Sequence, residues 1–215
     1  MITLVLEAAT YAGSVALLSD GVLLGERSVA MRGREREALM PAVAELLEAF
    51  GVRPAAIGRV VCGAGPGSFT SLRIAGGIAK GIAMAAGIPL VPVSSLALLV
   101  ASQKPLVPSR YLAAIDALRD EYYTELFEVD ALGTVSPQGP TRLVPSPVLQ
   151  AFAAEHQAHL VAHTVQPHAA AAASLTNLID STPPADLAGW EPAYGRLAEA
   201  QVKWEAAHGR PLAPR

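Results

Sequence analysis

Apolar runs separated by turn residues divide the first half of the chain into short strands. Segments 2–8, 14–20 and 22–31 each show the pattern of a β-strand, and Asp20-Gly21 is a two-residue hairpin signal between the second and the third. The chain is therefore expected to open as a meander of three strands. A later apolar run from Arg59 to Ala64 and another over 88–93 predict two further strands.

Apolar positions at helical spacing predict helices between these strands. The first predicted helix carries Leu39, Val43, Leu46, Leu47 and Phe50, and Gly51 ends it. Proline at position 41 is expected either in its first turn, where a missing N–H is tolerated, or at a kink in the helix. Two more helices are expected, one ending at Gly87 and one over 94–101.

The second half of the chain repeats the opening pattern. An apolar strand over 111–117 precedes an alternating strand over 121–129, segment 131–135 continues the meander, and helices are expected around 146–160 and 168–180. Glu7 and Asp116 hold equivalent positions near the end of the first strand of each half. This duplication predicts an α/β fold of two lobes, each with a mixed sheet and crossover helices. Both acids are then expected to point into a cleft between the lobes, because α/β folds place ligands at strand ends.

The composition of the chain indicates what class of protein it is. The chain has 215 residues, of which 52% are hydrophobic and 16% charged, so core material is ample and the composition argues against disorder. The net charge is −3 and no Lys/Arg block stands out, which makes the chain alone a poor candidate for strong nucleic-acid binding. Cys62 is the one cysteine, which fits a reducing compartment.

No membrane or secretion signal is expected from the sequence. Segment 2–8 has no basic region before it, and Lys80, Pro89 and Pro92 interrupt the apolar region 74–101. These features predict a soluble cytoplasmic protein.

The stretch GAGPGSFTSLRIAGGIAKGIA, from Gly63 to Ala83, resembles a phosphate loop in composition but not in spacing. The nearby Lys80 lies deep in the predicted helix, and Ser68 is not in a nucleophile-elbow pattern. The stretch predicts a strand-to-helix turn in which Ser68 or Thr70 caps the helix, or in which free N–H groups hold an anion weakly. The candidates for a vestigial nucleotide cleft are Glu7, Asp116, Gly65, Gly67 and Ser68.

The helix that follows has small residues on one side. Ser71, Ala75, Ala79 and Ala83 recur every fourth residue, and Leu72, Ile78 and Ile82 stand opposite. A ridge of small side chains lets another helix or a sheet approach closely. The ridge could pack on this chain's own sheet, but two sides that need burial favour an interface with a second polypeptide.

Four segments of the chain resemble the bacterial TsaB (YeaZ) family. The strongest is GPGSFTSLRIAGGIAKGIA at 65–83, and the others are LVLEAATYAGSVALL at 4–18, AAIDALRDEYY at 113–123 and, more weakly, EPAYGR at 191–196. The resemblance implies an actin/Hsp70/sugar-kinase-like (ASKHA) fold. It also implies a non-catalytic adapter in the synthesis of N6-threonylcarbamoyladenosine at position 37 of tRNAs that read A-starting codons.

The resemblance implies partners as well. The chain would pair with a TsaD-type catalytic subunit, act beside a TsaE-type ATPase, meet tRNA only through the complex, and form a homodimer without its partner. We place the partner surface on two helices, through Leu39, Val43, Leu46, Phe50, Ser71, Ala75, Ala79 and Ala83. The expected lobes are 1–105 and 106–196, followed by a tail at 197–215.

No catalytic residue and no metal site are expected. The catalytic paralogue family carries an H-x-x-x-H metal pair where this chain has Ser95 and Leu99. His159 and His163 have that spacing elsewhere, with His156 nearby, but the default for them is a solvated surface. ATP or ADP is the one cofactor that the fold would suggest. The alternatives to an adapter are a small ATPase or kinase of the same fold and, with less support, a peptidase.

Overall fold

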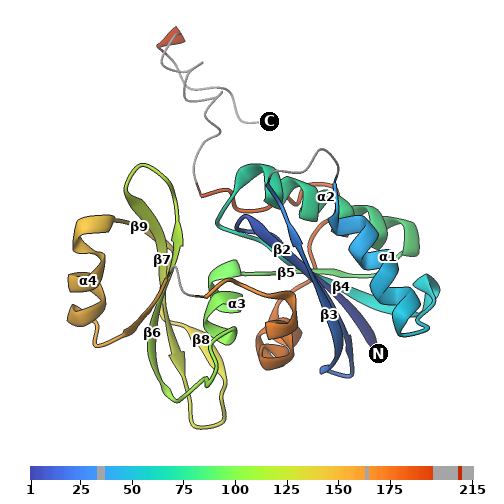
Figure 1. The fold of residues 1–215 in the computed structure, drawn as a ribbon, viewed down its shortest axis with the longest axis horizontal. Helices are drawn as coiled ribbons and strands as arrows, with labels where there is room; N and C mark the ends of the chain where they lie inside the picture. Colours follow the sequence, from blue (N-terminus) through green and yellow to red (C-terminus); the bar gives the residue numbers. More distant parts are fainter. Residues whose placement is uncertain (33–36, 163–164, 196–207, 210–215) are drawn as a thin grey trace.

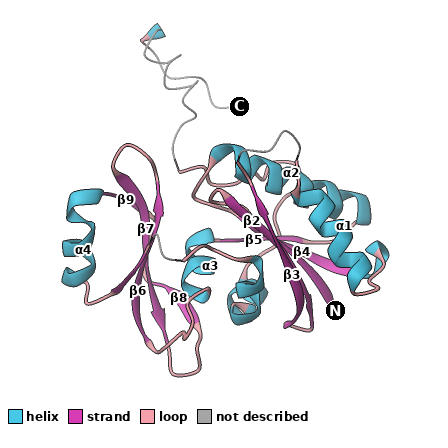
Figure 2. Ribbon diagram, viewed as in Figure 1, coloured by secondary structure: helices cyan, strands magenta, loops and turns pink. Residues whose placement is uncertain are grey.

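The computed structural model describes residues 1–32, 37–162, 165–195 and 208–209. Two sheets stand beside each other with helices in three places (Figure 1 and Figure 2). Two helices cover the outer face of the first sheet, short helices fill the space between the sheets, and one helix covers the outer face of the second sheet. This layering gives the molecule two lobes.

The first sheet contains the opening meander and two parallel strands. Its strands are β1 (Ile2–Glu7), β2 (Ala12–Ser19), β3 (Val22–Ala30), β4 (Ile57–Gly63) and β5 (Leu90–Val93). Their order is β3-β2-β1-β4-β5, with β1, β4 and β5 parallel to one another. Asp20 and Gly21 both have positive φ, as the predicted hairpin requires. Leu4 and Leu6 are buried on one face of β1 and Val5 on the other, which explains the continuous apolar run.

The helices of the first lobe begin and end close to the predicted positions. They are α1 (Leu39–Ala49), the 3₁₀ turn η1 (Pro54–Ala56), α2 (Phe69–Ala86) and α3 (Ser95–Ala101). Helix α1 packs on β2 and β3 and α2 packs on β4 and β1, so the two lie over neighbouring strands. Gly87 ends α2 with a left-handed φ of 64°, and the Ser94 hydroxyl caps α3 by accepting from Leu96 N.

The second lobe repeats the first in reduced form. Its elements are β6 (Ser109–Asp116), β7 (Glu121–Val129), β8 (Val135–Pro137), β9 (Arg142–Pro145), the 3₁₀ turn η2 (Ser146–Val148), α4 (Leu149–Glu155) and β10 (His159–Val161). Strand β6 is antiparallel to β7 and parallel to β10, as β1 is to β2 and β4. Strands β8 and β9 both pair with β7 and take the place of β3. The predicted duplication is confirmed.

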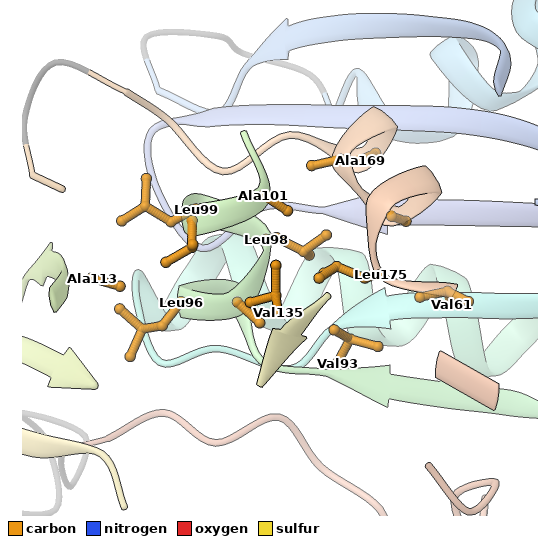
Figure 3. Close-up of a cluster of buried hydrophobic side chains, with 14 of the residues drawn as sticks. Val61, Val93, Leu96, Leu98, Leu99, Ala101, Ala113, Val135, Ala169 and Leu175 are labelled. Atoms are coloured by element: carbon orange, nitrogen blue, oxygen red, sulfur yellow. The ribbon is translucent and has the colours of Figure 1, made fainter. Parts of the chain in front are cut away.

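The largest core lies between the two sheets. Figure 3 shows Leu96, Leu98 and Leu99 of α3 among Val93 of the first sheet and Val135 of the second. The 3₁₀ helix η3 (Ala169–Ser174) and helix α5 (Thr176–Ser181) complete this core. Because α3 is apolar on every side, its sequence shows no amphipathic period, and both lobes bury surface against it.

The structure differs in detail from three expectations for the second lobe. Segment 131–135 mostly turns rather than extends, because Asp130 Oδ1 accepts hydrogen bonds from Leu132 N and Thr134 N at 2.8 Å each. The helix expected over 146–160 ends at Glu155, since Gln157 takes a φ of 52° and the chain enters β10. The helical segment expected around 168–180 is present but is divided into the short pair η3 and α5.

After β10 the chain returns to the first lobe. Ala169 N donates to Ser14 Oγ at 2.8 Å, Ala185 N to Leu90 O at 2.8 Å and Ala193 N to Ala64 O at 2.7 Å. Segment 169–195 therefore groups with the first lobe, which differs from our assignment of 106–196 to the second. Most of the expected tail at 197–215 lies outside the described residues.

Within the described ranges, no helix has both the length and the apolar character that crossing a bilayer requires.

Candidate functional site

A cavity of about 1510 Å³ lies between the two lobes. Its walls come from the β1–β2 turn, the loop before α2, the β6–β7 turn and the returning chain at Tyr194. The predicted cleft thus exists at the ends of the first strands of the two sheets. Of the five residues proposed to line it, Asp116, Gly67 and Ser68 do so, whereas Glu7 and Gly65 do not.

The loop GPGSFT is built to pack against the β1–β2 turn. A Cβ on Gly67 would lie 2.1 Å from Ala9 O, so only glycine permits this approach. Ser68 N donates to Ala9 O at 2.7 Å, and Ser95 N donates to Gly65 O at 2.9 Å. The loop N–H of Ser68 is consequently used inside the protein, which argues against the weak anion site considered from the sequence.

The predicted side-chain cap of α2 is wrong. Ser68 occupies the N-cap position, but its hydroxyl makes no hydrogen bond to the backbone of the first turn. It lies 3.0 Å from the hydroxyl of Ser71 instead. Thr70 falls inside the helix, which begins at Phe69.

Glu7 is a buried structural carboxyl rather than a cleft acid. Its side chain is fully buried, and its oxygens accept hydrogen bonds from Ala9 N and from the Ser95 hydroxyl, the latter at 2.8 Å. The Ser95 hydroxyl also accepts from Gly65 N at 3.1 Å, so this carboxyl joins β1, α3 and the loop before α2. Burial raises the pKa of Glu7 to about 7, although these hydrogen bonds oppose the shift.

Asp116 lies at the equivalent position in the second lobe but is exposed to the cleft. Its Oδ1 accepts from Leu118 N at 2.7 Å. The turn that follows has positive φ at Leu118, Arg119 and Asp120, a conformation that non-glycine residues seldom adopt in succession. The two acids therefore differ in environment, contrary to our expectation that both point into the cleft.

Many backbone donors of the two strand-end turns are already paired within the protein. In the first turn Ala9 N donates to Glu7 and Ala12 N to the Thr10 hydroxyl. In the second turn Leu118 N donates to Asp116, and Ala117 N donates to Glu121 O at 2.9 Å. A nucleotide diphosphate is held mainly by such free N–H groups. These four N–H groups are therefore not free to hold the phosphates of ATP or ADP.

The aromatic and arginine side chains on the cleft walls were not identified from the sequence. The Arg32 guanidinium lies 3.7 Å from the ring centroid of Tyr11, and the rings of Phe69 and Tyr194 lie 4.7 Å apart. Arg119 lines the same cavity. The sequence signal that could have revealed them is an aromatic residue in the turn after β1 and another in the GPGSFT loop. Whether the two lie near each other depends on the fold.

The histidines of the second lobe do not share a helix face. His156 caps the C-terminus of α4, and His159 lies in β10 with its ring 5.7 Å from that of Tyr111. His163 lies outside the described residues. The described part of the chain contains no group of three or more His, Cys, Asp or Glu side chains arranged to hold a metal. Leu99, at one of the two positions where the catalytic paralogue family carries its metal pair, is buried in the central core.

The residues chosen for the partner surface face inward. Ser71, Ala75, Ala79 and Ala83 are at most 3% exposed, and the three alanines pack under α2 with residues of β1 and β4. Leu39, Val43 and Leu46 are likewise buried under α1, whereas Phe50 is 43% exposed. The outward orientation expected for the small ridge is wrong, because small side chains are what lets α2 lie close to its own sheet.

Cys62 gives no support to a peptidase. The thiol is fully buried in β4, and burial raises its pKa well above the ordinary value. A buried, protonated thiol is a poor nucleophile.

Comparisons with known proteins find one family model and several curated relatives that are similar to this chain. The family model for TsaD, described as tRNA N6-adenosine threonylcarbamoyltransferase, matches residues 32–136. The TsaB protein of Escherichia coli is 35% identical over 131 residues, which is 60% of this chain and 56% of that protein. The TsaB protein of Haemophilus influenzae is 35% identical over 121 residues, or 56% and 51% of the two chains. The chain thus spans about half the length of the curated relatives it matches.

Solved structures extend the likeness to the whole fold. YeaZ from Pseudomonas aeruginosa superimposes with a TM-score of 0.74 at 27% identity, covering 90% of this chain and 99% of that one. A second structure, of a protein from the same organism with similarity to peptidase YeaZ, gives a TM-score of 0.77 at 27% identity over 91% and 99%. The two-lobed α/β fold with two mixed sheets, expected from the sequence, is confirmed.

Proposed function

We propose that this chain is a member of the TsaB (YeaZ) family and acts as a non-catalytic adapter in the synthesis of N6-threonylcarbamoyladenosine at position 37 of tRNA. The observation that carries the proposal is the GPGSFT loop, docked on the β1–β2 turn in a family whose curated members are named for this biosynthesis. The adapter works in the cytoplasm, together with the tRNA that the complex modifies.

The chemistry of the cleft supports an adapter over an ATPase or kinase of the same fold. The carboxyl of Glu7 is buried and hydrogen-bonded to the protein, so it is not available to position Mg²⁺ or water. Several N–H groups that would hold phosphates are paired within their own turns. No residue of this chain is assigned a catalytic role.

The partner surface in this proposal remains on α1 and α2 but moves to their outward sides. Gly77 and Gly81 of α2 are exposed, and a Cβ added to either would meet no atom within 4 Å. Glycine inside a helix costs about 0.5–1 kcal/mol relative to alanine. Nothing within the described part of this chain packs on these two positions, so a close helix from another subunit would give them a purpose.

The same two helices carry exposed apolar side chains. Met84 on α2 is 64% exposed and Met40 on α1 is 43% exposed. We assign this surface to a TsaD-type catalytic subunit, and to a second copy of the chain when that subunit is missing. A TsaE-type ATPase joins the complex, and tRNA is delivered to the assembled complex.

The experiment compares two arginine substitutions on exposed helix positions. Gly81→Arg places a long cation on the proposed surface, and Ala154→Arg places the same group on exposed α4 of the second lobe. Both variants should remain folded by circular dichroism. Gly81→Arg should lose capture of a TsaD-type subunit in a pull-down, and Ala154→Arg should retain it. Equal capture by the two variants would place the partner elsewhere.

A further inference from the structure

The cavity between the lobes combines charge and flat aromatic surface in a way that the adapter role does not use. Arg32 and Arg119 are the cations among its lining residues and Asp116 is the acid, so the lining carries a net charge of +1. The whole chain carries −3. A positive site in an acidic protein selects an anionic ligand, because a cleft with low-dielectric walls concentrates the local field.

Aromatic rings lie next to these cations on the first lobe. Tyr11 is 42% exposed with Arg32 over its ring, and Phe69 is 37% exposed beside Tyr194. The guanidinium of Arg73 lies 5.3 Å from the ring centroid of Phe69. Aromatic rings and guanidinium planes are the surfaces on which proteins stack unpaired bases. The ligand therefore has planar groups as well as negative charge.

We propose that this cleft binds a short single-stranded RNA segment. Its bases stack on Tyr11 and on the Phe69–Tyr194 pair, and its phosphates contact Arg32 and Arg119. The proposal rests on the proposed function, since it names a direct RNA contact for a subunit otherwise expected to meet tRNA only through the complex.

The size and donors of the cavity favour an RNA strand over a mononucleotide. Its volume of about 1510 Å³ exceeds the roughly 300–1,000 Å³ of typical small-molecule pockets. The N–H groups of Ala9 and Leu118 are used inside the protein, so neither is free to hold the clustered phosphates of ATP. Separated phosphates on a strand need only the two exposed arginines.

Because the overall charge of the chain is modest, the isolated chain should bind RNA only weakly. Two arginine contacts make only a small electrostatic contribution to RNA affinity, in agreement with the absence of a Lys/Arg block. Affinity for a complete tRNA would then come from this cleft together with contacts made by the catalytic subunit. Measurement on the isolated chain accordingly needs low salt.

The test is fluorescence anisotropy of the full chain with a 5′-labelled single-stranded heptaribonucleotide at 50 mM salt. Replacing both Arg32 and Arg119 by Ala should weaken binding at least tenfold. It should also reduce the slope of log K against log salt by about 1.4, since each phosphate contact on a single strand contributes about 0.7. Tyr11→Leu should weaken binding about 5- to 150-fold with the salt slope unchanged, the range expected for one lost stacked base.

Arg53→Ala is the matched control, because Arg53 is exposed and does not line the cavity. It should bind the oligonucleotide like the parent chain. Equal affinity of all variants, no binding of the parent chain at 1 mM protein, or full displacement of the oligonucleotide by stoichiometric ATP would each overturn the proposal.

Capture of a TsaD-type subunit by the same variants separates this inference from the adapter role. The cleft substitutions lie off the outward sides of α1 and α2, so capture should be unaffected. If the parent chain binds RNA but does not capture the TsaD-type subunit, the adapter role is refuted and the RNA site in the cleft is not.

Discussion

Protonation of Glu7 should control how the stability of this protein depends on pH. Its pKa is about 7 in the folded protein and near 4.5 when unfolded. Below pH 4.5 the carboxyl is protonated in both states and folding is not penalised. As the pH rises through 4.5 to 7, the unfolded chain releases this proton first, so the contribution of Glu7 to stability falls and then levels off above pH 7.

The size of the effect follows from the shift. One unit of pKa corresponds to about 1.4 kcal/mol, so a shift of this size lowers the free energy of unfolding by roughly 3 kcal/mol between pH 4.5 and pH 8. Glu7→Gln removes the charge while its amide oxygen can still accept from Ala9 N and its amide nitrogen can donate to the Ser95 hydroxyl. The substitution should therefore remove the pH dependence with little loss of packing.

The assay is urea unfolding of Glu7→Gln and the parent chain across this pH range. The stability of the variant relative to the parent should rise by roughly 3 kcal/mol between pH 4.5 and pH 8. Glu48→Gln, at an exposed position of α1, is the control and should show a flat difference. A difference for Glu7→Gln as flat as that of the control would refute the burial argument.

Three further substitutions test the packing of α2 and its loop. Ala79→Arg should unfold the protein by circular dichroism, since an unpaired charge under α2 costs several kcal/mol; a folded variant would mean that the small ridge faces outward. Gly81→Ala should raise the free energy of unfolding by about 0.5–1 kcal/mol in urea titration, because its Cβ meets no atom; a loss would reveal a contact on that side. Gly65→Ala should lower the melting temperature, because Gly65 has a φ of 87° and a Cβ would lie 2.4 Å from Ala193 O; an unchanged value would contradict the docked loop.

Local patterns in the sequence determined most of the elements and their order. Apolar runs and turn residues placed the strands of the first lobe within two or three residues, and Asp20-Gly21 and Gly87 marked a hairpin and a helix end that the structure contains. The equivalence of Glu7 and Asp116 revealed the duplication, which the matching relations of β1 and β6 to their neighbours confirm. These features are local because backbone conformation depends on a few adjacent residues.

Tertiary structure alone decided which of these residues face the cleft, the core or the solvent. Glu7 is buried while Asp116 is exposed, because Ser95 and the loop at Gly65 close over one strand end and not over the other. The small ridge of α2 faces the sheet because small residues fit close packing there as well as at an interface, so spacing could not separate the two. Tyr194 joins Phe69 across more than a hundred residues of chain because segment 169–195 returns to the first lobe, a contact set by long-range packing.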